Sequence, residues 1–302
     1  MTTDGTTWQA AARWGRVGAG IAAPATGAAT WRRELARLER LPYGAAWVNE
    51  GIGGREAFSQ LGVMLAATER LVVATGLANV WARQAPVMQA GAATLAEAHP
   101  GRVALGLGIS IPSLVELWGQ RSSKPLTEMR AYLDRMDASA EEAVRPSVPF
   151  PRLLGALGPR MLELARDRAD GAYPHTMPVA NTALARRVLG PGKLLVVGVG
   201  VILDDDLDRA RTLARRSPLF RLPDSPYTAN LRRLGYDEKD IAGEPSDRVV
   251  DEIFACGDGS AVAKRVHEHL DAGADHVVVQ PLGPDVPAIV DQLERIAGHL
   301  QT

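Results

Sequence analysis

The sequence has one cysteine, few aromatic residues and almost no net charge, and each shortage excludes a class of protein. Cys256 alone excludes an internal disulfide framework and fits a reducing compartment. Aromatic residues make up 5% of the chain, which argues against a surface that stacks nucleic-acid bases. The formal net charge of -1 provides no field that would hold nucleic acid or an anionic membrane. We therefore expect the ligand to be a small molecule.

Long apolar runs, targeting signals and metal-binding patterns are missing as well. No stretch approaches the roughly 18 uninterrupted apolar residues of a membrane span. The first residues, MTTDGTTWQAAARWGR, lack the early positive charge and apolar run of a signal peptide. These absences indicate a soluble cytoplasmic protein. No two His, Asp or Glu side chains have the spacing of a ligand pair, so no metal site is expected.

An alternation of short apolar segments with segments of helical spacing organises the 302 residues. The apolar segments begin at Arg16, Ala45, Arg70, Arg102, Arg152, Asp170, Leu194 and His276. Their continuous hydrophobicity is typical of parallel strands that helices cover on both faces. Eight repeats predict an α/β fold of the (β/α)8 TIM barrel class. A doubly wound open sheet has the same alternation, although no Gly-x-Gly-x-x-Gly motif follows the first strand.

The domain prediction is a single domain over residues 1–302, with the barrel core over residues 14–300. Residues 204–259, between strands seven and eight, contain two helical pieces joined by prolines. We expect this helical insertion to lie either on the rim of the barrel or in a subunit interface.

Polar residues and glycines follow the predicted strands, where a TIM barrel has its active site. They are Asn49 and Glu50 after strand two, Thr75, Gly76 and Asn79 after strand three, Gly106, Gly108 and Ser110 after strand four, Gly155 after strand five and His175 after strand six. Glycine there permits either an unusual backbone conformation or the close approach of a ligand. Glu50 is interpreted as a catalytic carboxylate or a solvated loop charge. His175 is interpreted as a donor to a ligand or a histidine held by a backbone carbonyl.

The segment Gly158–Met161 is the best local signal for binding. Pro159 suits the first position of a helix because its missing N–H costs nothing there. The backbone N–H groups of Arg160 and Met161 are then expected to be free at the positive end of the helix, which favours a phosphate. The alternative is that Gly158 and Pro159 merely cap a barrel helix.

Three longer segments resemble the bacterial-luciferase-like (LLM) superfamily of flavin and deazaflavin oxidoreductases. They are TERLVVATGLANVWARQAPVMQAGAATLAEAHPGRVALGLGIS, GPRMLELARDRADGAYP and HLDAGADHVVVQPL, and the resemblance runs from Trp14 to Leu282. Within the superfamily, the chain is most similar to actinobacterial F420-dependent oxidoreductases. The resemblance implies a TIM barrel that binds coenzyme F420, an 8-hydroxy-5-deazaflavin, at the carboxyl ends of its strands. FMN is the alternative cofactor.

The resemblance also implies where the cofactor lies. Its ring is expected against the backbone at the ends of strands three and four, over a bulge or a non-prolyl cis peptide near Thr75, Gly76 and Leu77. Gly106 and Gly108 are then bare because a side chain would collide with the ring, although relief of crowding inside the barrel explains at least one of the two. Arg83 is implied to contact the polyglutamate tail. The implied cofactor contacts are Asn49, Thr75, Gly76, Asn79, Gly106, Gly108, Ser110, Gly155, Gly158, Pro159, Arg160 and Met161.

The implied activity is hydride transfer between C5 of the deazaflavin and a carbon of a small organic substrate. Glu50 or His175 would exchange the accompanying proton. The alternatives are an FMN-dependent luciferase-like monooxygenase and a cofactor-binding barrel without turnover. A homodimer is implied, with the Ala-rich helices after strands two and three as its interface. The sequence does not identify the substrate.

Overall fold

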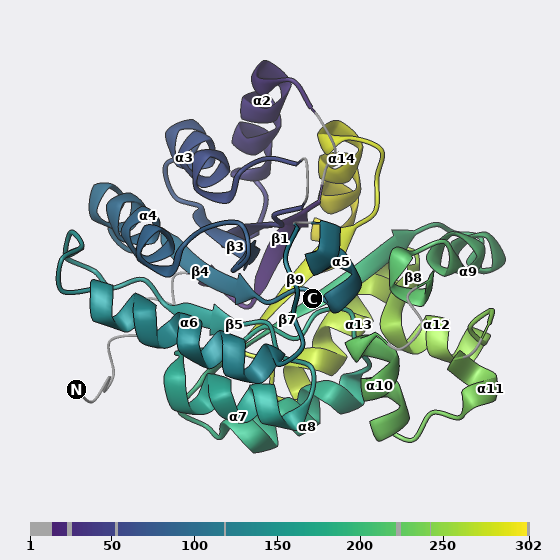
Figure 1. The fold of residues 1–302 in the computed structure, drawn as a ribbon. Coiled ribbons are helices and arrows are strands. Elements are labelled where there is room, and N and C mark those ends of the chain that lie inside the picture. Colours follow the sequence, from purple (N-terminus) through teal and green to yellow (C-terminus); the bar gives the residue numbers. More distant parts are fainter. Residues whose placement is uncertain are drawn as a thin grey trace.

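The structure is a computed structural model that describes residues 14–22, 26–51, 54–117, 119–221, 225–241 and 243–300. Eight parallel strands form a closed ring (Figure 1). In ring order they are β1 (Val17–Ile21), β2 (Ala45–Val48), β3 (Val72–Asn79), β4 (Val103–Gly108), β5 (Arg152–Leu154), β6 (Gly171–Ala172), β7 (Leu194–Leu203) and β9 (His276–Pro281). Because β6 pairs with β7 and β9 pairs with β1, the ring has no edge. The predicted TIM barrel is confirmed, and the open sheet is excluded.

Each apolar segment predicted as a strand overlaps one of these eight strands. The reason is burial on both faces: all six residues of β4 and all six of β9 are buried. Helices cover the outer face of the ring, and packed side chains fill its interior. A strand in this position needs a continuous apolar run rather than an alternating one.

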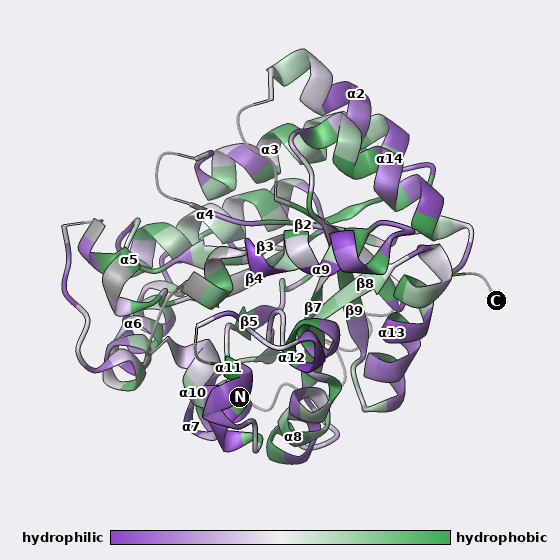
Figure 2. Ribbon diagram, turned by 90° about the vertical axis from the view of Figure 1, so that its right-hand side faces the viewer, coloured by the Kyte–Doolittle hydropathy of each residue, from purple (hydrophilic) through white to green (hydrophobic). Residues whose placement is uncertain are grey.

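The helices surround the ring of strands (Figure 1). They are α2 (Ala28–Leu38), α3 (Ala57–Ala67), α4 (Ala85–Ala98), α6 (Pro125–Ser139), α7 (Pro159–Arg168), α8 (Val179–Leu189), α13 (Gly259–Asp271) and α14 (Val286–Ala297), and a short helix, α5 (Pro112–Leu117), follows β4. Hydrophobic and hydrophilic residues alternate along α13 and α14 in Figure 2. This alternation is typical of helices that bury one face against a sheet.

The interior of the barrel combines aromatic residues with a paired histidine. Trp14 packs edge-on against Trp47, with ring centroids 5.7 Å apart. The Nε1–H of Trp47 donates to Nε2 of His276 at 3.1 Å, and Nδ1 of His276 bonds the carbonyl of Gly15 at 2.9 Å. Burial lowers the pKa of His276 to about 4, with an opposing effect from the Gly15 hydrogen bond, so this histidine is neutral. Polar groups inside the barrel are thus tolerated where they have partners.

The segment between β7 and β9 differs in one respect from the predicted helical insertion. Its helices are α9 (Leu207–Arg215), the 3-10 helix η2 (Pro218–Arg221), α10 (Pro226–Arg233), α11 (Glu238–Ile241) and α12 (Asp247–Ile253). It also contains a ninth strand, β8 (Phe254–Gly257), which pairs in parallel with Gly200–Leu203 at the end of β7. β7 has ten residues, so its last part extends beyond the ring and is free to pair outside it. The segment has its own apolar core, which includes Ile202, Leu231 and Val250.

Candidate active site

The carboxyl ends of the strands meet at one end of the barrel, called here the barrel mouth, and β3 is irregular there. Thr75 pairs with Leu105 and Ala78 with Leu107, so β3 has one extra residue in a bulge. The peptide bond between Gly76 and Leu77 is cis. Both features lie where the resemblance implied them. We call residues 75–78 the β3 platform.

The hydroxyl of Thr75 is hydrogen-bonded within the sheet. Its hydroxyl donates to the carbonyl of Gly106 at 2.8 Å and accepts from the N–H of Gly106 at 2.9 Å. Thr75 is fully buried. It therefore fixes the bulge to β4, and its hydroxyl proton is not available to the edge of a bound ring.

The glycines around the β3 platform are explained by the protein itself. A Cβ at Gly106 would lie 2.3 Å from the carbonyl oxygen of Thr75. At Gly108 and Gly155 it would lie 2.9 Å and 2.4 Å from the side chain of Leu77. At Gly106 the added Cβ would meet backbone, which excludes a side chain whether or not a ring is bound, whereas at Gly108 and Gly155 the side chain of Leu77 would have to shift. Crowding within the barrel therefore explains Gly106 without a ring, and a collision between a bound ring and a side chain at Gly106 or Gly108 stays a prediction.

Glu50 is buried rather than solvated. Its side chain is 4% exposed, and its carboxylate accepts from the N–H groups of Ala57 and Asn79 at 3.2 and 2.8 Å and from the guanidinium of Arg83. The backbone N–H of Glu50 donates to the carbonyl of Leu77 at 3.2 Å. Glu50 thus holds the end of β2, the start of α3 and the β3 platform together. The arrangement is that of a positioning residue.

Arg83 is committed to the same cluster. It pairs with Glu50 and, at 2.8 Å, with Glu56, and its guanidinium carbon lies 5.1 Å from the ring centre of Phe58. Its side chain is 8% exposed. A buried, paired guanidinium cannot reach out to a polyglutamate tail, which corrects the role that the resemblance implied for Arg83.

His175 lies after β6 and bonds two side chains, not the backbone carbonyl of the alternative interpretation. Its Nε2 lies 2.5 Å from Oε1 of Gln280, and its Nδ1 lies 2.7 Å from the hydroxyl of Thr176. An amide oxygen only accepts, so Nε2 carries the proton and Nδ1 accepts from Thr176. Burial lowers the pKa of His175, opposed by the bond to Gln280, so the imidazole is neutral at neutral pH.

Tyr173, two residues before His175, was not predicted as a site residue. It is 1% exposed, packs against Trp47 with ring centroids 5.1 Å apart and meets the edge of His175 at 5.9 Å. Its hydroxyl has no hydrogen-bond partner in the described part of the chain. The available signal was an aromatic residue within the sixth apolar segment, in the sequence GAYPH.

The start of α7 has the predicted form with one correction. Gly158 is the extended residue before the helix, Pro159 is the first helical residue, and no side chain caps the end. The N–H of Met161 is not free, because it donates to the carbonyl of Gly158 at 3.2 Å, whereas the N–H of Arg160 has no acceptor among the described residues. A Cβ at Gly158 would lie 3.0 Å from Nη1 of Arg233. Sequence reasoning missed this contact between an arginine of α10 and the start of α7.

The remaining predicted contacts also lie at the barrel mouth. Asn49 is exposed after β2, and Ser110 has a positive φ of 62° after β4. Asn79 is 8% exposed; its side-chain oxygen accepts from the N–H of Trp81 at 3.0 Å. Among the described residues its side-chain NH2 has no hydrogen-bond partner, so this group is left as a donor.

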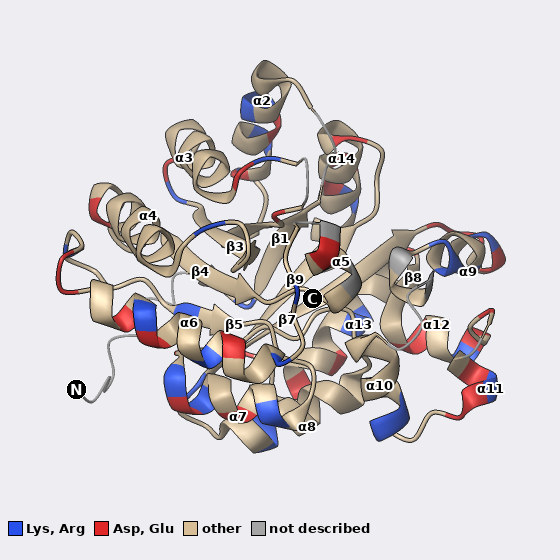
Figure 3. Ribbon diagram, in the orientation of Figure 1, with Lys and Arg blue, Asp and Glu red and all other residues tan. Residues whose placement is uncertain are grey.

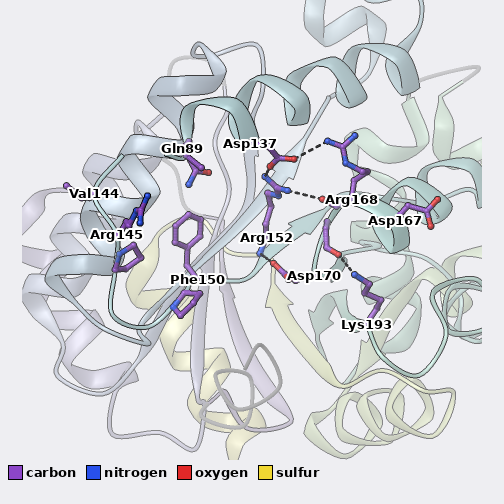
Figure 4. A pocket seen from close by; sticks show the side chains of 14 residues that line it. Gln89, Asp137, Val144, Arg145, Phe150, Arg152, Asp167, Arg168, Asp170 and Lys193 are labelled. Atoms are coloured by element: carbon purple, nitrogen blue, oxygen red, sulfur yellow. Dashed lines mark hydrogen bonds and ion pairs between the residues drawn. The ribbon is translucent and has the colours of Figure 1, made fainter. Parts of the chain in front are cut away.

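A cavity of about 670 Å³ lies at the opposite end of the barrel (Figure 4). It lies beside Arg152, the first residue of β5, and Lys193, which precedes β7. Arg152 pairs with Asp137 at 2.7 Å, Arg168 with the same carboxylate at 3.0 Å, and Nζ of Lys193 donates to a backbone carbonyl. Because TIM-barrel sites lie at the carboxyl ends of strands and these charges already have partners, the cavity is not the candidate site.

The described residues lack both metal-binding clusters and membrane-spanning helices. They contain no group of three or more His, Cys, Asp and Glu side chains arranged to hold a metal ion. None of their helices is both long enough and apolar enough to cross a membrane. Cys256 is half-buried, and burial raises the pKa of its thiol to about 11, so the thiol stays protonated at neutral pH.

Comparisons with known proteins agree with this geometry. Residues 14–276 match the family model of the luciferase-like monooxygenases. A 5,10-methylenetetrahydromethanopterin reductase of Methanolobus tindarius is 25% identical over an alignment 290 residues long, which covers 82% of this chain and 89% of the relative.

Two solved structures share the fold. An F420-dependent secondary alcohol dehydrogenase in complex with an F420-acetone adduct has a TM-score of 0.76 at 15% identity, over 95% of this chain and 99% of that one. The coenzyme F420 dependent tetrahydromethanopterin reductase from Methanopyrus kandleri has a TM-score of 0.72 at 18% identity, over 94% of this chain and 99% of that one. With the family model matched over most of its length, the chain belongs to the luciferase-like monooxygenase family.

Proposed function

We propose that the protein is a coenzyme F420-dependent oxidoreductase that transfers a hydride between the cofactor and a carbon of a small organic substrate. The observation that carries the proposal is the β3 platform at the barrel mouth, with its bulge and the hydrogen bonds of Thr75 that hold it to β4. Family membership supports an oxidoreductase, and similar proteins with F420 in their names support this cofactor.

The residues present fit a deazaflavin with a phosphorylated side chain. The β3 platform offers bare backbone at Gly76, beside the unpartnered hydroxyl of Tyr173. The start of α7 offers the N–H of Arg160 and the guanidinium of Arg233, which suit a phosphate because the helix end is positive. When bound, the deazaflavin supplies the carbon that carries the hydride.

The chain's own residues would bind and orient the ring. Thr75 and Glu50 hold the β3 platform in place, and the side-chain NH2 of Asn79 donates to the edge of the ring. Asn49 and Ser110 border the mouth, while Gly106, Gly108 and Gly155 leave room for the side chain of Leu77. The phosphate would lie at the start of α7, called here the phosphate end, which consists of Gly158, Pro159, Arg160 and Met161.

Of the two residues expected to exchange a proton, His175 keeps that role in this proposal and Glu50 does not. The carboxylate of Glu50 already accepts hydrogen bonds from two backbone N–H groups and from the guanidinium of Arg83. His175 is neutral, and its Nδ1 is connected to the hydroxyl of Thr176. A proton can therefore pass between a substrate oxygen and the imidazole through Thr176.

A second candidate function is that of an FMN-dependent monooxygenase, which the description of the family itself favours. A fluorescence titration of the purified protein with oxidised F420, run beside an identical titration with FMN, separates the two. We expect micromolar or tighter binding of F420 and weaker binding of FMN. A preference for FMN would transfer the proposal to the monooxygenase, and binding of neither would refute both cofactor assignments and leave a barrel without turnover.

A further inference from the structure

Tyr173 carries a buried hydroxyl without a partner, and its place in the fold is unusual. In the described residues, the other buried side-chain atoms of this kind belong to Trp31, Asn181 and Asp240, on α2, α8 and α11. Tyr173 instead follows β6 at the barrel mouth. Nearly all buried polar groups in proteins have a hydrogen-bond partner, so an exception at a candidate binding site points to a partner that arrives from outside the chain.

The hydroxyl lies beside the backbone of two strands. A Cβ at Gly76, in the β3 platform, would lie 3.4 Å from the hydroxyl oxygen, and one at Gly198, on β7, would lie 2.8 Å from it. Both positions are glycine, so the hydroxyl is buried against the backbone of these strands rather than against their side chains. The ring of Tyr173 is fixed by its packing on Trp47 and His175. The hydroxyl thus has a set position next to the β3 platform.

Neighbouring hydroxyl and imidazole donors are already engaged. The hydroxyl of Thr75 donates to Gly106, that of Thr176 donates to His175, and Nε2–H of His175 donates to Gln280. Burial raises the pKa of Tyr173 well above its ordinary value, with a smaller contribution from Tyr227, so the hydroxyl keeps its proton. Tyr173 is therefore a neutral donor beside the platform with no acceptor in the described protein.

We propose that the hydroxyl of Tyr173 donates a hydrogen bond to a carbonyl oxygen of the deazaflavin ring. The proposal rests on the proposed function, because the ring is placed on the β3 platform there. The ring is the acceptor, rather than the substrate, because the hydroxyl lies against Gly76 of that platform. Tyr173 is then a cofactor-binding residue that the sequence did not reveal.

The substitution Tyr173→Phe tests this, with Tyr43→Phe as a matched control. Tyr43 is also buried, but its hydroxyl donates to the carbonyl of Leu293 at 2.8 Å. In the cofactor-free protein, Tyr43→Phe should lower Tm by about 2 °C, because it leaves a buried acceptor unpaired. Tyr173→Phe should leave Tm unchanged or raise it. The affinity for oxidised F420, measured by fluorescence titration, should fall about tenfold in Tyr173→Phe and stay unchanged in Tyr43→Phe.

The outcomes separate this inference from the proposed function. If the wild-type protein binds F420 and Tyr173→Phe binds it equally well, the inference fails and the function stands. If Tyr173→Phe lowers Tm as Tyr43→Phe does, the hydroxyl has an internal partner and the inference also fails. If the wild-type protein does not bind F420, the proposed function fails, and the inference fails with it because there is no ring to accept the hydrogen bond.

Discussion

At the scale of single residues, the site is defined by which polar groups already have partners. The polar atoms of Glu50, Arg83 and Thr75 are hydrogen-bonded within the protein. Tyr173 and Asn79 each have a donor group with no acceptor among the described residues. This division separates side chains that fix the β3 platform from those that remain for a ligand. The sequence alone cannot show which polar groups have partners, because these hydrogen bonds join residues on different strands.

The buried ion pair of Glu50 and Arg83 gives a prediction about stability. Glu50→Ala would leave the guanidinium of Arg83 and two backbone N–H groups without their acceptor, so the free energy of unfolding in urea should fall by about 3–5 kcal/mol. Glu56→Ala is the matched control, because Glu56 pairs with the same arginine but is half exposed and caps α3. The control should cost about 1 kcal/mol. Equal losses in the two variants would show that Glu50 does not hold the platform.

At the scale of secondary-structure elements, the sequence was sufficient for the barrel and insufficient for its additions. Eight strands were predicted because burial on both faces produces continuous apolar runs, as in β4 and β9. The strand β8 was missed because four residues at the edge of the sheet carry too little pattern. The start of α7 was predicted from Gly158 and Pro159, but the contact with α10 was not, since it joins residues far apart in the chain.

The contact between α10 and α7 predicts a role for Arg233 in binding the cofactor. Arg233→Ala should weaken the binding of F420 about tenfold, because it removes a cation from the proposed phosphate end. Arg232→Ala is the control, because the guanidinium of Arg232 is paired with Glu238. Titration with the deazaflavin lacking its phosphate should show no difference between Arg233→Ala and the wild-type protein. A loss of equal size with that compound would exclude the phosphate as the partner of Arg233.

At the scale of the whole molecule, charge is distributed unevenly over the outer helices. Figure 3 shows α3 without a charged residue and α4 with a single acidic turn, whereas α6, α7 and α9 carry many charges. Val87 on α4 is 57% exposed. An uncharged face with exposed apolar side chains is typical of a subunit interface. The homodimer implied by the resemblance stays a prediction, and these helices are the place where it should form.

Light scattering after size-exclusion chromatography checks the dimer. The wild-type mass should be twice the 32.2 kDa of one chain. Val87→Arg should reduce it to one chain, because a guanidinium would be buried without a partner. Leu213→Arg is the matched control, since Leu213 is also apolar and 40% exposed but lies on α9. A wild-type protein that elutes as a monomer, or a dimer unaffected by Val87→Arg, would contradict this interface.

The central claim is that F420 binds at the barrel mouth with its ring on the β3 platform. A crystal structure of the protein with oxidised F420 tests it most directly. The account predicts the ring against Gly76 and Leu77, a ring carbonyl within hydrogen-bond distance of the hydroxyl of Tyr173, and the phosphate at Gly158–Met161 beside Arg233. A ring bound elsewhere, or a phosphate remote from the start of α7, would contradict it.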